Sequence, residues 1–318
     1  FEAGKRLMHT MSTGNVIRTL WQMWSTRQHL STKMGLHPGA DFLSWVQAVL
    51  AEEGLVTTAD LANLRAQRPD GGLLIHPERK DADTNNLNPR LVLVSADITT
   101  STRVLFPEMA QLYWAEPEQV SPAYYVRASM AVPGFFEPLR LEIGSEPSEA
   151  TRKAWHEMAR FDGLPPESAV LVDGGLFSNF PIDVFHNPTI VPRLPTFGVK
   201  LSPFRNRARV IDSPANYGSA ILDSTRRVLD FEFFLRNRDY RQLVALINTE
   251  GFDWLNFDIS NAEKLGLFER GAEAADTFLR QFDWPGYKVV RQQMLDRIPR
   301  GAPPVSTTGT PGDVVNTN

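Results

Sequence analysis

Apolar side chains recur at helical spacing along residues 39–54. Asp41 lies where an N-terminal cap would, and Gly54 follows the last turn. The apolar positions fall on one face of a helix and comprise Phe42, Val46, Val49 and Leu50. This pattern predicts an amphipathic helix that buries one side.

Three further stretches have the same period. Residues 57–66 predict a short helix with Thr57 or Thr58 as the N-cap, because a threonine hydroxyl can accept a hydrogen bond from an amide of the first turn. Residues 215–247 alternate Leu, Val and Phe with arginines, as a long amphipathic helix does. Residues 271–282 place Ala and Phe on one helix face. We therefore expect several helices that pack through one side.

Three short segments are almost continuously apolar and rich in β-branched residues. They are residues 90–98, 168–175 and 195–202. Strands of this kind, separated by helical segments, are typical of a parallel sheet that helices cover on both faces. We predict an α/β fold of the three-layer α/β/α type with a mostly parallel central sheet.

Polar segments set the expected limits of the domain. Residues 67–90 are rich in Asn, Asp and Pro and indicate a long surface loop. The end of the chain is mainly Gly, Pro, Ser and Thr, a composition that buries too little apolar surface to fold. The sequence shows no internal repeat and no linker between two cores. We predict one domain over residues 1–295 and a disordered tail over residues 296–318.

Charge and composition exclude several classes of function. The net charge is −4, so there is no overall basic field to attract nucleic acid. The chain has no cysteine, which excludes disulfides, thiolate metal sites and a cysteine nucleophile. Neither a signal peptide nor an apolar run of about 18 residues is visible in the sequence. We expect a cytoplasmic or peripheral membrane protein.

The sequence Asp-Gly-Gly occurs twice, in two different settings. Asp70 follows a polar stretch with a proline, where Asp and Gly are the residues that a surface turn requires. Asp173 follows the apolar run Ala169–Val172 and so ends a predicted buried strand, at the edge where ligands bind in open α/β sheets. A carboxylate held there can serve as a general base. Gly174 and Gly175 let the backbone turn sharply and let another group approach.

On spacing alone, a general base and a structural turn residue are equally good interpretations of Asp173. Two blocks of sequence favour the base. Residues 128–138 read ASMAVPGFFEP, and residues 173–181 read DGGLFSNFP. In this order and spacing they resemble the patatin-like phospholipase family, whose members carry an A-S-x-A-x-P-x-x-F-x-P block and then D-G-G or D-G-A followed by N-x-P. The resemblance extends over most of residues 35–284.

The resemblance implies a lipid acyl hydrolase of the phospholipase A kind, which cuts a carboxylic ester in a lipid or phospholipid. The family is an α/β hydrolase relative with a Ser-Asp dyad. Its serine lies in a G-x-S-x-G nucleophile elbow, and amides of a glycine-rich loop form the oxyanion hole. By this resemblance Asp173 is the base, Gly174 and Gly175 shape the turn that aims it, and no metal or organic cofactor takes part.

The sequence departs from the family at the nucleophile. It contains neither G-x-S-x-G nor G-x-G-x-x-G. In the family both motifs precede the segment that residues 35–61 resemble, and the chain begins with Phe1. We therefore expect the first strand, the glycine-rich loop and the elbow upstream of residue 1, so that the printed chain carries the base without the nucleophile and is inactive alone. The alternative is a non-catalytic lipid-binding or regulatory protein with the same fold.

No other residue is a convincing nucleophile, triad histidine or metal ligand. We expect Ser129, Ser178 and Ser219 to have packing or hydrogen-bonding roles, since none lies in the glycine-flanked pattern of an elbow. The six histidines are scattered without metal-ligand spacing. His186, the nearest to Asp173, begins a loop and is expected to be solvated.

Two arginine-rich stretches leave peripheral membrane contact open. Residues 204–209 and 226–241 place arginines beside aromatic residues, a combination that could attract anionic head groups. A solvated helix face over a Phe-rich core explains the same pattern and is favoured.

Overall fold

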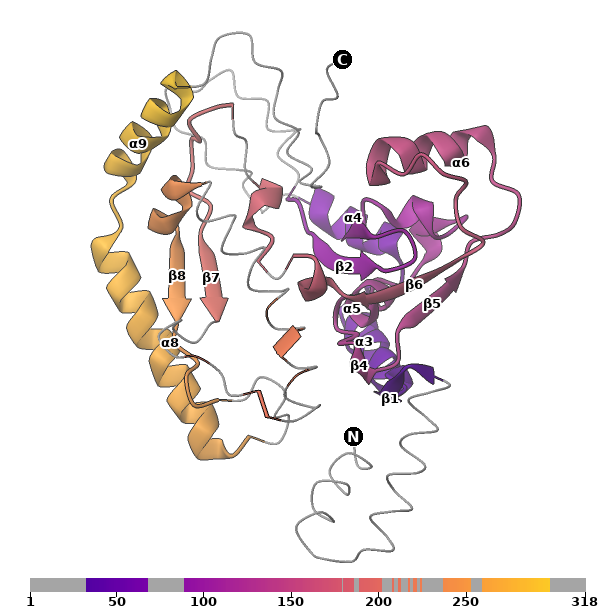
Figure 1. Ribbon diagram of the computed structural model, residues 1–318, viewed down its shortest axis with the longest axis horizontal. Coiled ribbons are helices and arrows are strands. Elements are labelled where there is room, and N and C mark those ends of the chain that lie inside the picture. Colours follow the sequence, from indigo (N-terminus) through magenta and orange to yellow (C-terminus); the bar gives the residue numbers. More distant parts are fainter. Residues whose placement is uncertain are drawn as a thin grey trace, which may run out of the picture. The chain divides into compact units, whose positions relative to one another are not determined.

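The computed structural model describes two compact units of the chain (Figure 1). They are residues Phe1–Ser178 and Asn179–Asn318. Apart from scattered single positions between 208 and 224, the structure describes residues 33–67, 89–178, 180–185, 189–201, 237–252 and 259–297. Residues 298–318, most of the expected tail, lie outside this part, and one domain over residues 1–295 stays a prediction.

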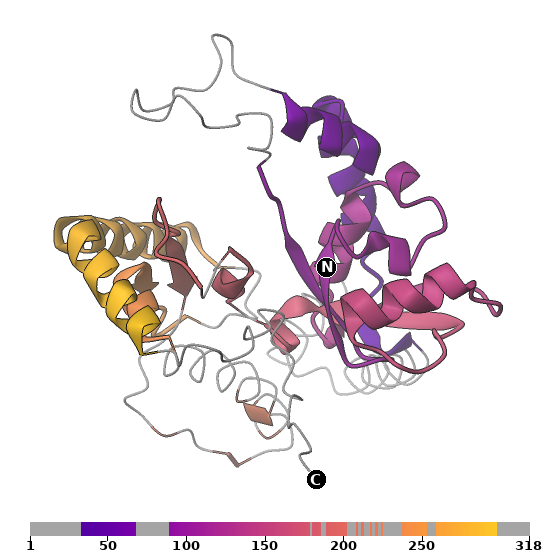
Figure 2. The same cartoon turned by 90° about the horizontal axis from the view of Figure 1, so that it is seen from above.

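A four-stranded antiparallel sheet forms the centre of the first unit (Figures 1 and 2). Its strands lie in the order β3-β2-β6-β5, and each neighbouring pair is antiparallel. A tight turn at residues 98–101 joins β2 to β3, which makes them a hairpin. The bounds are Leu93–Asp97 for β2, Thr102–Phe106 for β3, Leu139–Glu142 for β5 and Ser168–Asp173 for β6.

One face of this sheet carries a core of large side chains. Helix α5 (Ala123–Ser129) packs against β2 and β6, and the rings of Tyr125 and Phe106 stack with their centroids 4.7 Å apart. Trp155 is fully buried and lies edge-on to Tyr113. The first unit also contains α6 (Glu149–Ala154), the π-helix η4 (Trp155–Ala159) and the short 3-10 helices η2 (Ala110–Leu112) and η3 (Pro117–Gln119).

Two helices precede the sheet. Helix α4 (Thr58–Ala66) begins at a capping box in which Thr57 and Asp60 bond each other's backbone amides, which confirms Thr57 as the N-cap. Helix α3 (Ala40–Glu52) begins at Gly39, which has φ 69° and no side-chain cap, so the prediction of Asp41 as the cap is wrong. Asp41 already lies inside the first turn, where its charge favours the helix dipole.

The first unit also contains a two-stranded parallel sheet. It pairs β1 (Gly35–His37) with β4 (Gly134–Phe136). A Cβ at Gly35 would lie 2.2 Å from the backbone nitrogen of Glu137, so only glycine allows the two segments to approach this closely.

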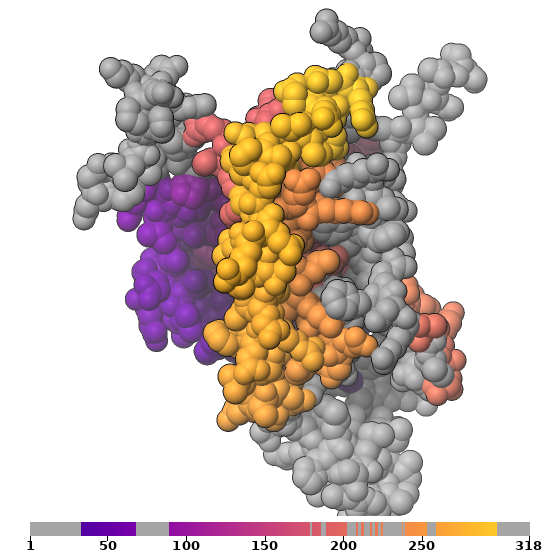
Figure 3. All heavy atoms as spheres, turned by 90° about the vertical axis from the view of Figure 1, so that its left-hand side faces the viewer, coloured from indigo at the N-terminus to yellow at the C-terminus, as the bar shows by residue number. Residues whose placement is uncertain are grey.

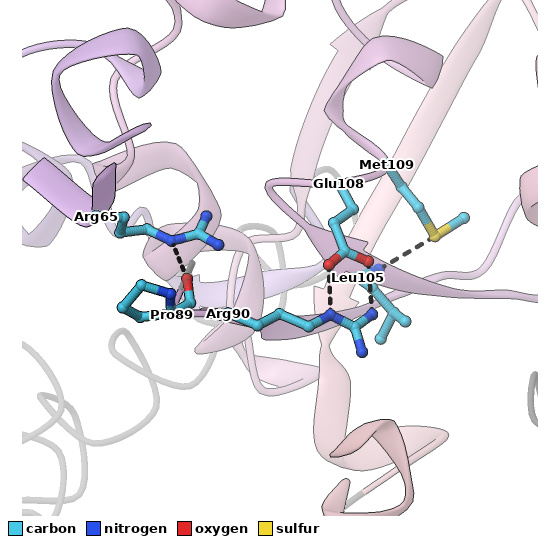
Figure 4. A network of polar contacts seen from close by, with 6 residues as sticks. All are labelled: Arg65, Pro89, Arg90, Leu105, Glu108 and Met109. Carbon is cyan, nitrogen blue, oxygen red and sulfur yellow. Dashed lines mark hydrogen bonds and ion pairs between the residues drawn. The ribbon is translucent and has the colours of Figure 1, made fainter. Parts of the chain in front are cut away.

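The chain that enters β2 is held by arginines on both sides (Figure 4). Arg65 of α4 donates to the carbonyl oxygen of Pro89 at 2.6 Å, and Arg90 makes a two-pronged ion pair with Glu108. The hydrogen bond with Arg90 holds the pKa of Glu108 below its usual value. These contacts fix where β2 begins.

The second unit is built on a parallel pair of strands, β7 (Gly198–Leu201) and β8 (Val244–Ile247). Helix α8 (Asn261–Gln281) packs against β8 and is followed by α9 (Trp284–Asp296); Figure 3 shows the two helices along one surface of the protein. The 3-10 helices η6 (Ile182–Phe185) and η7 (Arg238–Gln242) complete the described part. The small core consists of Ile182, Tyr240, Leu243, Val244 and Tyr287.

The predicted long helix over residues 215–247 is wrong at its carboxyl end. Residues 238–242 form the 3-10 helix η7 and residues 244–247 form strand β8. Pairing with β7 stabilises the extended conformation of residues 244–247, and this stabilisation outweighs the helical pattern of the sequence. Elsewhere the mixture of helices with parallel and antiparallel strands agrees with the predicted α/β class. Within the described residues the parallel pairs are β1-β4 and β7-β8, whereas the four-stranded sheet is antiparallel and not mostly parallel as predicted.

Candidate functional site

Asp173 is the last residue of β6, as the apolar run before it predicts. Its side chain is partly exposed, whereas its strand neighbour Ser95 is fully buried. The Ser95 hydroxyl donates to the carbonyl oxygen of Val172 at 2.8 Å. The carboxylate therefore stands at the end of a well-ordered strand pair and still reaches the surface.

The Asp-Gly-Gly turn fixes the orientation of the carboxylate. The amide of Gly175 donates to Asp173 Oδ1 at 2.6 Å, and Asp173 is thereby the N-cap of the 3-10 helix η5 (Gly174–Leu176). The amide of Ser178 then donates to the carbonyl oxygen of Gly174 at 2.8 Å and closes the turn. A side chain held in this way loses little freedom when it acts in a reaction.

Gly174 is required by the close approach of β2. A Cβ at this position would lie 2.1 Å from the carbonyl oxygen of Val94, which is far below van der Waals contact. The clash involves backbone, so no side-chain movement could relieve it. At Gly174, the group that comes close to this turn is the backbone of β2.

The two sequence blocks meet through the backbone. The amide of Asp173 donates to the carbonyl oxygen of Ala131 at 2.9 Å, and Ala131 belongs to the block 128–138. Helix α5, which leads into that block, packs against β6 and η5. The structure thus brings together two segments whose only link in the sequence is their spacing.

A second carboxylate ends a strand of the same sheet and differs from Asp173 in its burial. Asp97, at the end of β2, is fully buried. It accepts hydrogen bonds from the amide of Thr99, the hydroxyl of Thr100 and the hydroxyl of Tyr113. Burial and the Asp97 charge raise the pKa of Tyr113 well above its usual value. Asp97 is a structural residue of the turn, because its oxygens are occupied by the protein itself.

The serines proposed as structural lie near the turn. Ser129 ends α5 and is half-buried. Ser178 follows the 3-10 turn, and its Oγ accepts a hydrogen bond from Arg103 Nη1 at 3.4 Å. Both positions are compatible with packing and hydrogen-bonding roles, which stay a prediction.

Several residues singled out in the sequence lie outside the described part of the chain. They are Asp70, Asn179, His186, Ser219 and most of residues 204–209 and 226–236. The surface-turn interpretation of the first Asp-Gly-Gly copy and the two interpretations of the arginine-rich stretches therefore stay predictions.

The described histidines occupy structural or surface positions. His37 is buried with its ring centroid 4.9 Å from that of Phe135, and burial lowers its pKa. His156 is exposed, and its Nδ1 lies 2.6 Å from an oxygen of Asp162. Within the described ranges, no three His, Asp or Glu side chains gather in a way that could hold a metal ion. In the same ranges no helix combines the length and apolarity needed to cross a membrane.

Sequence reasoning missed the groups that support Asp173. The carbonyl of Val94 and the carbonyl of Ala131 cannot be found from residue type, because every residue has a carbonyl. Arg127 is only 4% exposed and could have been noticed, since an arginine inside an apolar helix demands partners. Ser95 gave a similar signal as a polar residue in an apolar run.

Comparison with known proteins shows the family of this chain. The chain is 23% identical over 255 residues to the uncharacterized protein YqhO of Bacillus subtilis (strain 168), covering 79% of this chain and 70% of that protein. No solved structure matches significantly. The profile described as Patatin-like phospholipase matches residues 8–186, more than half of the chain, and ends just after the Asp-Gly-Gly turn. With its two sequence blocks joined at Asp173, this chain belongs to the patatin-like phospholipase family.

Proposed function

We propose that the intact polypeptide hydrolyses a carboxylic ester of a lipid, in the manner of a phospholipase A, with Asp173 as the general base of a Ser-Asp dyad. One observation carries this proposal. Asp173 is partly exposed at a strand end, and the amide of Gly175 orients its carboxylate. Membership of the patatin-like phospholipase family supports lipid as the substrate class.

The proposed reaction has two half-reactions. The carboxylate of Asp173 takes the proton of the serine hydroxyl while the serine oxygen attacks the ester carbonyl carbon. The tetrahedral intermediate then collapses, the carbon–oxygen bond to the leaving alcohol breaks, and Asp173 returns the proton to that alcohol. In the second half-reaction Asp173 takes a proton from water, which attacks the acyl-serine, and the serine leaves with that proton. No metal or organic cofactor enters these steps.

The serine is proposed to lie in residues upstream of Phe1. The printed sequence has no G-x-S-x-G and no glycine-rich loop of the G-x-G-x-x-G kind. The proposal therefore assigns the elbow and the oxyanion-hole amides to a preceding segment and predicts that residues 1–318 are inactive alone. If the full-length polypeptide has no G-x-S-x-G serine before Phe1, this part of the proposal is wrong.

The test compares the two Asp-Gly-Gly copies in the full-length polypeptide. Asp173→Asn keeps the size of the side chain but removes its basicity, so kcat for a phospholipid or short-chain ester should fall by about 10²–10⁴-fold. Asp70→Asn is the matched control and should leave kcat unchanged. Full activity of the Asp173→Asn protein would exclude the base role.

The missing elbow favours one other function, a non-catalytic lipid-binding or regulatory protein. A fluorophosphonate probe distinguishes the two, because it forms a covalent bond only with an activated serine. Labelling of the full-length polypeptide at a G-x-S-x-G serine, lost in Asp173→Asn, supports the enzyme. Lipid binding without labelling supports the non-catalytic alternative.

A further inference from the structure

Arg127 is a buried cation at the end of α5, only a few residues before the turn that carries Ala131. Its Nη2 donates to the carbonyl oxygen of Pro38 at 3.0 Å and to the carbonyl oxygen of Glu137 at 2.5 Å. Pro38 follows β1 and Glu137 follows β4, so one guanidinium group caps the ends of both strands of the parallel pair. Without it, the carbonyl groups of the exposed Pro38 and the half-buried Glu137 would lose this donor.

The hydrogen bond to Glu137 closes a loop of the backbone. Residues 127–137 leave α5, pass through a turn and enter β4, and Arg127 joins the two ends. Ala131 lies inside this loop, and its carbonyl oxygen accepts the amide of Asp173. The loop is held at its far end as well, because the amide of Glu137 donates to the carbonyl oxygen of His37 at 2.8 Å.

The pocket around the guanidinium group is shaped for arginine. A Cβ at Gly39 would lie 2.4 Å from Arg127 Nε, so the side chain rests directly on the backbone of Gly39. The positive φ of 69° at Gly39 turns the chain at this point and starts α3. A lysine ammonium is a point donor without the planar fork, so it can replace the charge but not this packing.

We propose that Arg127 is a positioning residue for Asp173. It closes the loop 127–137, this loop presents the carbonyl of Ala131, and that carbonyl fixes the backbone of Asp173 at the end of β6. The consequence for catalysis rests on the proposed function of Asp173 as a base. The structural part, control of the Asp173 amide by Arg127, does not rest on it.

Hydrogen–deuterium exchange tests the structural part on the chain as printed. Arg127→Met keeps length and apolar packing but removes the donors, so amide exchange in peptides covering residues 130–137 and 170–178 should rise by about tenfold or more. Tyr113→Phe is the matched control, since it removes a buried hydrogen bond to Asp97 of the same sheet. It should not change exchange at residues 170–178. Unchanged exchange at residues 170–178 in a folded Arg127→Met protein would overturn the proposal, as would a uniform rise over the first unit.

If the Arg127→Met protein does not fold, the same exchange experiment is made with Arg127→Lys. The lysine retains the charge and should give a smaller rise in exchange confined to the same two peptides. A rise spread over the whole unit, or none, would mean that Arg127 has only a general structural role.

Kinetics of the full-length polypeptide test the catalytic part. Arg127→Lys should lower kcat about tenfold with KM nearly unchanged, because a displaced base affects the chemical step rather than binding. Tyr113→Phe should leave both constants near those of the unchanged protein. If Asp173→Asn is inactive while Arg127→Lys is fully active, this proposal fails and the base assignment survives. If Asp173→Asn is active, the base assignment fails, and the exchange experiment still decides the structural part.

Discussion

The two units bury their apolar residues to different degrees. In the first, rings such as Phe106, Tyr113 and Trp155 are completely enclosed behind a four-stranded sheet. In the second, α8 has no buried residue, and its Phe268 is 74% exposed. Other large apolar side chains of the second unit are exposed as well, among them Val199, Leu201, Leu246, Leu265 and Leu279.

The difference shows where a precise site can be built. A carboxylate is aimed reproducibly only if the backbone beneath it is fixed, and a close-packed core fixes it. Asp173 belongs to the first unit, where β2, α5 and the Asp-Gly-Gly turn contact one another directly. The parallel strand pair and exposed helix of the second unit offer no comparable support within the described residues.

The largest expected difference between the units comes from the same substitution made in each. Phe106→Ala removes a fully buried ring stacked on Tyr125 and should lower the free energy of unfolding by about 3–5 kcal/mol. Phe268→Ala, on the exposed side of α8, should change it by less than about 0.5 kcal/mol. Urea denaturation followed by tryptophan fluorescence measures both. Equal losses would show that the outer side of α8 is covered in solution.

The second unit nevertheless contains one buried ion pair whose loss should be severe. Arg291 Nη1 lies 3.6 Å from Asp239 Oδ2, which also accepts the hydroxyl of Tyr287 at 3.2 Å. Arg291→Met leaves the buried Asp239 without its cation and should cost about 3 kcal/mol of unfolding free energy. The double variant Asp239→Leu with Arg291→Met should recover much of this loss. A double variant as unstable as the single one would contradict the ion-pair explanation.

Two glycines give effects of opposite sign. Gly174→Ala forces a Cβ against the Val94 carbonyl and should cost about 1–3 kcal/mol. Gly266→Ala, inside α8, meets no atom closer than 3.8 Å and should stabilise the protein by about 0.5–1 kcal/mol through helix propensity. Thermal unfolding of the two variants gives the comparison. An unchanged melting temperature of the Gly174→Ala protein would mean that the turn lies further from β2.

The smallest effect is electrostatic and depends on pH. The hydrogen bond from Arg90 holds the pKa of Glu108 below its ordinary value, so the pair stabilises the fold above the ordinary pKa of glutamate and its contribution is lost as the pH falls through the lowered pKa. Both side chains are 40% exposed, which limits the effect to below about 1 kcal/mol. Glu108→Gln should therefore be slightly less stable than the unchanged protein at pH 7, and the difference should shrink near pH 3. A difference independent of pH would contradict this assignment.

The sequence predicted those elements whose pattern is local. The helix at residues 40–52, a cap at Thr57 or Thr58, a strand within residues 90–98 and the strand end at Asp173 all follow from spacing and capping chemistry. The strand β8 was not predicted, because it ends a longer stretch with a helical pattern and is extended through its pairing with β7. The cap of α3 was misplaced because a glycine with positive φ leaves no side-chain signal.

The sequence by itself determined the family and drew attention to Asp173, since two blocks in the right order are readable without any structure. Only the tertiary structure decided what surrounds that residue: the Val94 carbonyl packed against Gly174, the Ala131 carbonyl bonded to the Asp173 amide, and the loop closed by Arg127. The physical reason is that these supports are backbone groups brought together from distant segments. Every residue has the same backbone groups, so the side chains in the sequence do not show which backbone groups meet in the fold.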